Sequence, residues 1–330
     1  MKRLTRPLII IALGLLTLLL LLKLGNIDIS MNTLRRINPA YLAAAVVIHY
    51  SGFAMRGWRW QKLLKGSGHS VGYGYTVTLL LAGWFVSALI PARLGDVARA
   101  WMLRRDHNVP MAQGLGSIAA ERAFDILSIL MLAAAAAAFA LTGRTPPWVW
   151  RTIGGGTLLL GILIAILLLS PQLEDFFIRL LPWSLYKKTV HFGFELLNSI
   201  RQVGKSPELL LLLTAQSLYI WLCDIFLMAL VFCSIGASVP FSVSAFTAMA
   251  VDLAAAVPII PGALGQVEGT ALGLLSLFQI PAAQSSLMVL LNRFISFWTF
   301  ILVSGAVTYL FGFSQALNPD KLKGGVQNDL

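Results

Sequence analysis

The sequence predicts an all-α polytopic membrane protein, with about six full transmembrane helices and two re-entrant helical hairpins that are broken by proline and glycine. Of the 330 residues, 58% are hydrophobic and 12% are charged. Soluble domains are usually about 45–50% apolar and about 25% charged, so a water-soluble globular fold is excluded. Residues Gly66–Ala92 and Gly269–Asn292 contain no Lys, Arg, Asp or Glu, and runs of that length can cross a hydrocarbon core.

The predicted elements follow the hydropathy along the chain. Full spans are expected at about 7–24, 40–56, 112–142, 152–170, 208–235 and 286–311, and the two hairpins at about 76–105 and 243–275. The second span ends in Arg56, Trp58, Arg59 and Trp60, which we interpret as a belt at the membrane interface. Residues 171–206 form the only sizeable polar region, which predicts amphipathic helices on the membrane surface.

The chain is expected to form a single transmembrane domain over residues 1–330. Its predicted parts are an N-terminal helix and loop (1–39), a first repeat half (40–142), a linking helix with a basic amphipathic cytosolic segment (143–207), a second repeat half (208–312) and a cytosolic tail (313–330).

An internal repeat defines the two halves. Residues Ile90–Val97 and Ile260–Val267 both read I-P-x-x-L-G-x-V. Each motif follows a long helix and a short apolar segment and precedes another long helix, which carries Arg122 in the first half and Arg293 in the second. The alternative is that the prolines and glycines only kink two packed helices.

Charge predicts the topology. Lys2, Arg3 and Arg6 place the N-terminus in the cytoplasm under the positive-inside rule. A hairpin at 76–105 then returns its arginines toward the cytoplasmic face, and the second hairpin enters from outside. The two halves are therefore predicted to be inverted relative to each other, an arrangement typical of transporters with a site at the bilayer midplane.

The hairpins predict an anion-binding centre. A helix that starts just after Pro91 or Pro261 would direct free N–H groups and its positive dipole end toward the bilayer centre. A lipid phosphate is the expected anion there. Nearby charged residues would complete a polar cavity, because intramembrane charges usually face a cavity or a partner. In the alternative interpretation, the charges only form salt bridges that lock helices together.

Three motifs carry a family resemblance: L-I-P-A-R-L-G-D-V-A-R-A (89–100), A-E-R-A-F-D (120–125) and P-I-I-P-G-A-L-G-Q-V-E-G (258–269). With them the chain resembles the lysylphosphatidylglycerol synthase transmembrane-region family, also described as flippase-like domain proteins, over roughly residues 8–311. The resemblance implies movement of a lipid between leaflets without the aminoacyltransferase activity of fused relatives. The positions that match the motifs, and our predicted substrate-binding residues, are Arg93, Asp96, Glu121, Arg122, Asp125, Gly262, Gly265, Glu268 and Arg293.

The leading hypothesis is a flippase-like protein that moves a polar-headed lipid, such as an aminoacyl-phospholipid or a glycolipid, between the leaflets of the bacterial inner membrane, with both termini cytoplasmic. Arg93, Arg122 and Arg293 would bind phosphate. Glu121, Asp125 and Glu268 would bind amine or hydroxyl groups, or would gate transport by protonation. The expected partners are membrane lipids with anionic phosphate head groups, and the net charge of +11 is assigned to lipid contact and cytoplasmic loops rather than to nucleic acid. No cofactor, metal or catalytic residue is expected. The alternatives are an integral-membrane enzyme acting on a lipid or polyprenyl phosphate, and a non-catalytic partner of a lipid-synthesis enzyme.

Overall fold

The described part of the protein is all-helical. A computed structural model describes residues 37–90, 94–140, 206–256 and 261–310, with scattered residues between 151 and 204. Its elements are α3 (Pro39–Gly66), α4 (Tyr73–Leu89), α5 (Leu94–His107), α6 (Met111–Ala140), α9 (Pro207–Ser234), α10 (Phe241–Ala255), η1 (Pro261–Ala263), α11 (Gln266–Leu277), α12 (Ala282–Arg293), η2 (Phe294–Thr299) and α13 (Phe300–Leu310). The predicted span at 7–24, most of the segment 143–205 and the tail lie outside the described residues.

The α3 and α9 helices begin in the same way. Pro39 and Pro207 occupy first-turn positions, where proline loses no helical hydrogen bond. The Asn38 side chain accepts a hydrogen bond from the Ala40 N–H, and the Ser206 hydroxyl accepts one from the Leu209 N–H. Each helix therefore has a local N-terminal signal that its own sequence supplies.

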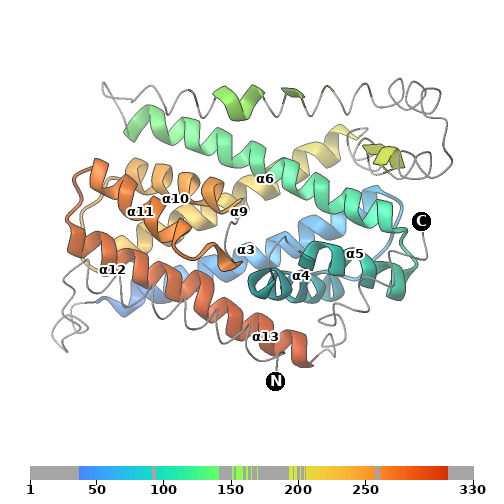
Figure 1. Cartoon of the computed structure of the whole chain (residues 1–330), viewed down its shortest axis with the longest axis horizontal. Helices are drawn as coiled ribbons and strands as arrows, with labels where there is room; N and C mark the ends of the chain where they lie inside the picture. Colours follow the sequence, from blue (N-terminus) through green and yellow to red (C-terminus); the bar gives the residue numbers. More distant parts are fainter. Residues whose placement is uncertain are drawn as a thin grey trace.

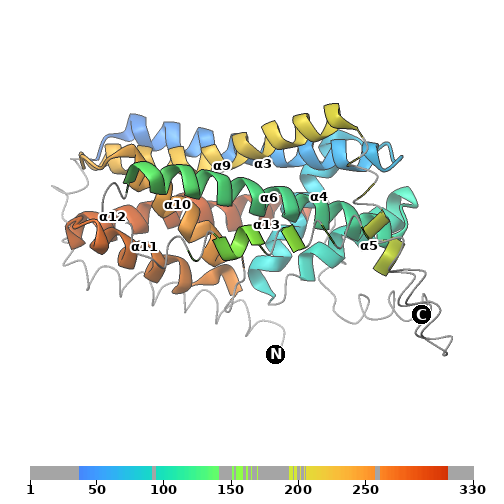
Figure 2. The same cartoon turned by 90° about the horizontal axis from the view of Figure 1, so that it is seen from above.

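Elements from the two predicted halves pack against each other. The α3 and α9 helices lie side by side along one side of the molecule, and α6 packs on α10 (Figures 1 and 2). The last helix, α13, packs on α4, and η1 also contacts α4. The core is therefore built from contacts between the first and second halves of the chain.

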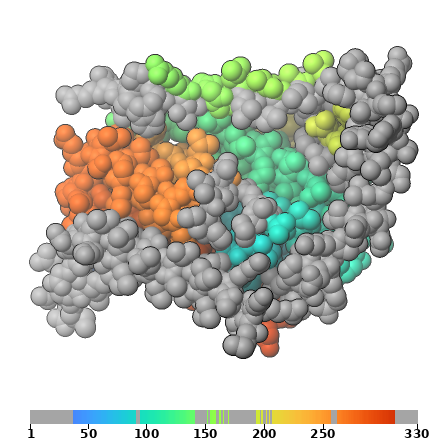
Figure 3. Space-filling view, viewed as in Figure 1, coloured from blue at the N-terminus to red at the C-terminus, as the bar shows by residue number. Residues whose placement is uncertain are grey.

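The α4–α5 and α10–α11 pairs lie toward opposite ends of the long axis of the molecule (Figure 1). The space-filling view shows atoms of the second pair, in orange, at the left end and cyan atoms of the first pair toward the right (Figure 3). The α4 and α5 helices approach closely where Gly83 of α4 meets Gly95 of α5. A Cβ on Gly95 would lie 1.7 Å from the Gly83 carbonyl oxygen, so only glycine fits there. The second pair turns through Gly262 (φ 67°) and Gly265 (φ 78°), a backbone region that favours glycine.

The helices have the length and surface of membrane spans. Among the described residues, Met111–Ala140, Pro207–Ser234 and Ala282–Leu310 are each long and apolar enough to cross a bilayer. Their exposed side chains include Phe139 (75%), Leu211 (74%) and Leu302 (73%), as expected where the surrounding solvent is lipid. A helical membrane protein is thus confirmed, while the six-plus-two topology and the inverted repeat stay predictions.

The interfacial belt predicted at the end of the second span is wrong in part. The helix continues to Gly66, and Trp60 and Arg59 are fully buried. The Trp60 indole donates a hydrogen bond to Ser117 Oγ, 3.0 Å away. These side chains are internal because α6 and α9 cover that face of α3, whereas Trp58 is 38% exposed.

The predicted helix start at Pro261 is also wrong. Residues 261–263 form the short helix η1, and α11 begins at Gln266, with Gly265 as its N-cap. The last predicted helix begins earlier than expected, at Ala282, and contains one π-helical stretch, η2, directly after Arg293. Such stretches often occur at functional sites because they redirect side chains within a helix.

Candidate functional site

A cavity of about 410 Å³ lies in the interior, where the tips of the two short-helix pairs approach the long helices. Each helical element named above contributes at least one residue to its lining. The apolar part of the lining includes Phe53, Ile129 and Met228. The charged residues that line it are Arg56, Asp96, Arg122, Asp125, Asp224, Asp252 and Arg293.

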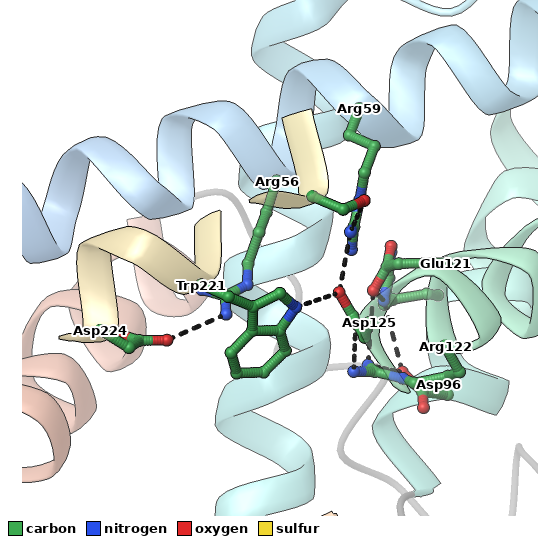
Figure 4. Close-up of polar contacts among 10 residues, drawn as sticks. Arg56, Arg59, Asp96, Glu121, Arg122, Asp125, Trp221 and Asp224 are labelled. Atoms are coloured by element: carbon green, nitrogen blue, oxygen red, sulfur yellow. Dashed lines mark hydrogen bonds and ion pairs between the residues drawn. The ribbon is translucent and has the colours of Figure 1, made fainter. Parts of the chain in front are cut away.

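Asp125, from the middle of α6, connects three helices (Figure 4). Its Oδ1 lies 2.8 Å from Arg59 Nη1 of α3 and accepts a hydrogen bond of 3.1 Å from the Trp221 indole of α9. Its Oδ2 lies 3.4 Å from Nη1 of Arg122, which is three residues earlier on the same helix. Arg59 Nη1 also donates a hydrogen bond of 2.7 Å to Ser217 Oγ. Since Arg59 is fully buried, both contacts are shielded from solvent.

Glu121, four residues earlier on α6, is bound by Arg99 of α5. The two form a forked pair, with Arg99 Nη2 3.0 Å from Glu121 Oε2 and Nη1 3.5 Å from Oε1. The Arg99 guanidinium also stacks over the Trp60 ring, with 4.0 Å between Cζ and the ring centroid. Both side chains are fully buried, so this pair joins α5 to α6 and lies behind the cavity lining.

Arg122 is held more loosely than Arg59 or Arg99. Its nitrogens lie 3.4–3.5 Å from Asp96, Glu121 and Asp125, and its side chain is 27% exposed. The guanidinium carbon lies 5.6 Å from the Trp84 ring centroid. Several carboxylates therefore neutralise Arg122 together without any one of them making a short contact.

Arg56 lines the same cavity, beside Trp84. Its guanidinium carbon is 5.0 Å from the Trp221 ring centroid and 5.2 Å from that of Trp84. Its ionic partner is Asp224, at 3.4 Å, and Asp224 also lies 3.6 Å from His49 Nδ1. Cation–π contacts of this kind hold a guanidinium in place while leaving part of its hydrogen-bonding capacity unused: Arg56 Nε has no hydrogen-bond partner among the described residues.

The repeated motif of the second half forms a separate network. Glu268 Oε2 accepts a hydrogen bond of 2.7 Å from the Gly265 N–H, which caps α11, and its Oε1 lies 2.7 Å from Arg293 Nε. Arg293 Nη2 donates to the Gly262 carbonyl oxygen at 3.0 Å. The N-terminus of α11 is predicted to attract a substrate anion. In the structure, the Glu268 carboxylate of the same helix already occupies this position.

The structure brings together most of the predicted site residues, but in two clusters. The first contains Asp96, Glu121, Arg122 and Asp125, and the second contains Gly262, Gly265, Glu268 and Arg293. Of these, the cavity is lined by Asp96, Arg122, Asp125, Gly262 and Arg293. Arg93 lies outside the described residues.

Sequence reasoning missed the contribution of α3. Arg56 was assigned to the membrane interface, yet it is 3% exposed and lines the cavity. The spacing of His49, Phe53, Arg56 and Arg59 is the signal that was available, because it places polar side chains on one helical face for over two turns. Intramembrane charges on one face predict a polar interior rather than an interface.

These features define a polytopic helical membrane protein with a partly open, charge-lined cavity between its helices. A family model described as "Lysylphosphatidylglycerol synthase TM region" matches residues 8–304. The chain therefore belongs to this family, as its motifs predict. No solved structure gives a significant match to the chain.

The curated relatives include several UPF0104 membrane proteins. A UPF0104 membrane protein of Methanothermobacter thermautotrophicus is 24% identical over 93% of this chain and 96% of its own length. A UPF0104 membrane protein of Methanocaldococcus jannaschii is 26% identical over 68% of this chain and 94% of its own length. Both organisms are archaea, so the predicted bacterial origin is not supported.

One relative has a named activity. The glycosyltransferase AglD of Haloferax volcanii is 34% identical over 40% of this chain, but the match covers 22% of that protein. Together with the family match, it indicates a lipid-related membrane protein.

Proposed function

We propose that this protein binds the head group of a phosphate-bearing lipid in its central cavity and moves the lipid between the leaflets of a cell membrane, as a flippase-like transporter. The observation that carries the proposal is the cavity itself, with three arginines in its lining and helices from both halves around it. A polar chamber inside apolar helices gives a head group an alternative to the hydrocarbon core, which charged groups enter only at high cost.

Arg56 and Arg122 are the proposed phosphate-binding residues. Their contacts with carboxylates are 3.4–3.5 Å long, whereas the shortest contacts of Arg59, Arg99 and Arg293 are 2.7–3.0 Å. Both stack near Trp84 and line the cavity, so an incoming phosphate can replace their long contacts with shorter ones. The better-satisfied arginines then hold the helices in place, and Arg93 stays a predicted phosphate ligand.

The predicted inverted topology fits this role. We infer that 40–142 and 208–312 form the two halves, that α4–α5 and α10–α11 are re-entrant hairpins from opposite sides, and that both termini are cytoplasmic. Their positions toward opposite ends of the molecule support this arrangement (Figure 1). Each motif also supplies a cavity residue, Asp96 in the first half and Gly262 in the second. Alternating opening of the two sides would then move the head group past a fixed site.

Reconstitution tests the proposal. The purified protein is placed in vesicles that contain trace amounts of fluorescent phosphatidylglycerol, phosphatidylethanolamine or a glycolipid, and movement is followed by chemical quenching of the outer leaflet. We expect accelerated movement of at least one phosphate lipid. Arg56→Gln and Arg122→Gln should each slow it by about tenfold or more, which corresponds to loss of about 1.4 kcal/mol of binding free energy.

The matched control is Arg105→Gln, because Arg105 is 45% exposed and pairs with Asp106 outside the cavity. This variant should transport lipid as the wild type does. Folded wild-type protein that accelerates none of the lipids would refute the proposal. A new lipid product in mass spectra of the vesicles would instead favour the enzyme alternative.

A further inference from the structure

One carboxylate in the cavity differs from the rest. Each of Asp96, Glu121, Asp125, Asp224 and Glu268 has at least one arginine nitrogen within 3.5 Å. Asp252 of α10 lines the cavity but has no hydrogen-bond or ion-pair partner among the described residues. The guanidinium groups of the cavity region, on Arg56, Arg59, Arg99, Arg122 and Arg293, are already in contact with the other carboxylates.

An ionised Asp252 would be costly in this position. Its side chain is half-buried, and a carboxylate that lacks a partner in a partly apolar cavity is less well solvated than one in water. Its electrostatic surroundings add to that cost, because the carboxylates of Asp224 and Asp125 repel it and, among the described residues, only Arg56 attracts it. A second negative charge in the cavity would raise this cost further, and a proton bound to Asp252 would offset it without any additional ligand.

Asp252 shares the cavity lining with charged or titratable groups from five other helices. They are His49 and Arg56 on α3, Asp96 on α5, Arg122 and Asp125 on α6, Asp224 on α9 and Arg293 on α12. Of the helices that pack on α10, α11 carries Glu268, which is paired with Arg293 and lies outside the lining. All except His49 have an oppositely charged partner within 3.5 Å, and His49 lies 3.6 Å from Asp224. Since these groups are already paired with one another, a bound phosphate would be the main change in the electrostatic potential at Asp252.

We propose that Asp252 is a proton site that couples lipid movement to a proton gradient. This inference rests on the proposed transport function. A phosphate that binds Arg56 cancels the one positive charge that attracts Asp252, so Asp252 takes up a proton from the water of the open side. By linkage, protonation of Asp252 strengthens phosphate binding to the same degree.

This coupling sets the direction in which the proton moves relative to the lipid, and the number of protons that move with each lipid. One phosphate with a single negative charge and one proton enter together, and they leave together on the other side. The loaded cavity then carries no additional net charge, which removes the work of moving a charge against the membrane potential. The substrate class is accordingly a lipid with one net negative charge on its phosphate, and the proton travels in the same direction as the lipid.

Vesicles with a pH gradient test this inference. Fluorescent phosphatidylglycerol is the probe, and valinomycin with equal potassium on both sides holds the membrane potential at zero. With one proton per lipid, a gradient of one pH unit should drive the leaflet ratio of the probe to about tenfold, with accumulation on the alkaline side. Asp252→Asn should leave the ratio near one, because the amide cannot take up a proton, while Asp252→Glu should keep the gradient response.

The matched control is Asp106→Asn, which makes the same chemical change in a residue outside the cavity. It should preserve the tenfold ratio. If wild-type protein moves the probe but ignores the pH gradient, the proton site is refuted and the transport function stands. A gradient response that survives in Asp252→Asn also refutes the assignment.

A second measurement separates this inference from the transport function. Short-chain phosphatidylglycerol is added to the detergent-purified protein in weakly buffered dye solution. Wild-type protein and Asp252→Glu should take up about one proton per chain on lipid binding, and Asp252→Asn none. Uptake at Asp252 without any transport in vesicles would refute the transport function and leave the proton site. Absence of both would refute the two together.

Discussion

The contacts of Asp125 predict an asymmetric response to substitution. Asp125→Asn keeps the shape of the side chain but removes its charge, which leaves the fully buried Arg59 with two neutral acceptors, the Ser217 hydroxyl and the new amide oxygen, and no carboxylate in contact. An uncompensated buried charge costs about 3–5 kcal/mol. Arg59→Met has a smaller effect of about 1–3 kcal/mol, because Asp125 keeps the Trp221 indole and Arg122 as donors.

The double variant completes the argument. If the two costs were independent, their sum would be about 4–8 kcal/mol. In Arg59→Met/Asp125→Asn there is no orphaned guanidinium, so we expect a total of about 1–3 kcal/mol. The free energy of unfolding can be measured by titration with sodium dodecyl sulfate in mixed micelles, followed by tryptophan fluorescence.

Arg105→Gln serves as the control in this assay, because the side chain is 45% exposed and should matter by less than about 0.5 kcal/mol. Additive costs in the double variant would refute the reasoning. Equal losses in the two single variants would do so as well, since they would mean that Asp125 gains nothing from its remaining donors.

Substitutions of Gly95 and Gly262 give further predictions in the same unfolding assay, and a substitution of Gly273 is the control. Gly95→Ala should cost at least about 1–3 kcal/mol, because its Cβ would lie 1.7 Å from the Gly83 carbonyl oxygen, whereas Gly273→Ala fills open space and should be nearly neutral. Gly262→Ala should cost about 1–3 kcal/mol, since φ is 67° and the Cβ would lie 2.6 Å from Phe297 Cε2. Wild-type stability in either variant would contradict the packing described here.

Much of the fold could be predicted because membrane helices are encoded locally. Hydropathy placed the helices observed as α4, α6 and α9 within a few residues of their ends. Proline and glycine marked the breaks near residues 91 and 262, where the helical hydrogen-bond pattern cannot continue. Family motifs added the residues of the Glu268–Arg293 network, although the sequence did not show that these two side chains bind each other.

The site could be predicted only in part, because its contacts join distant segments. The Trp221 indole reaches Asp125 across 96 residues, and Arg59 reaches Ser217 across 158. Periodicity along one helix shows which residues share a face, but it does not show which neighbouring helix that face meets. For this reason the burial of Arg59 and Trp60 was not foreseen.

The sequence by itself determined that the chain forms apolar helices with two broken segments and a small set of intramembrane charges, since these follow from local composition and backbone chemistry. Only the tertiary structure decided how the charges are used. It joined Arg59, Arg99 and Arg293 to partners at 2.7–3.0 Å and left Arg56 and Arg122 loosely held beside Trp84. It placed Asp252 in the cavity without an ion-pair partner among the described residues. The reason is physical: the energy of a buried charge depends on what surrounds it in space, and packing brings those groups together from different helices.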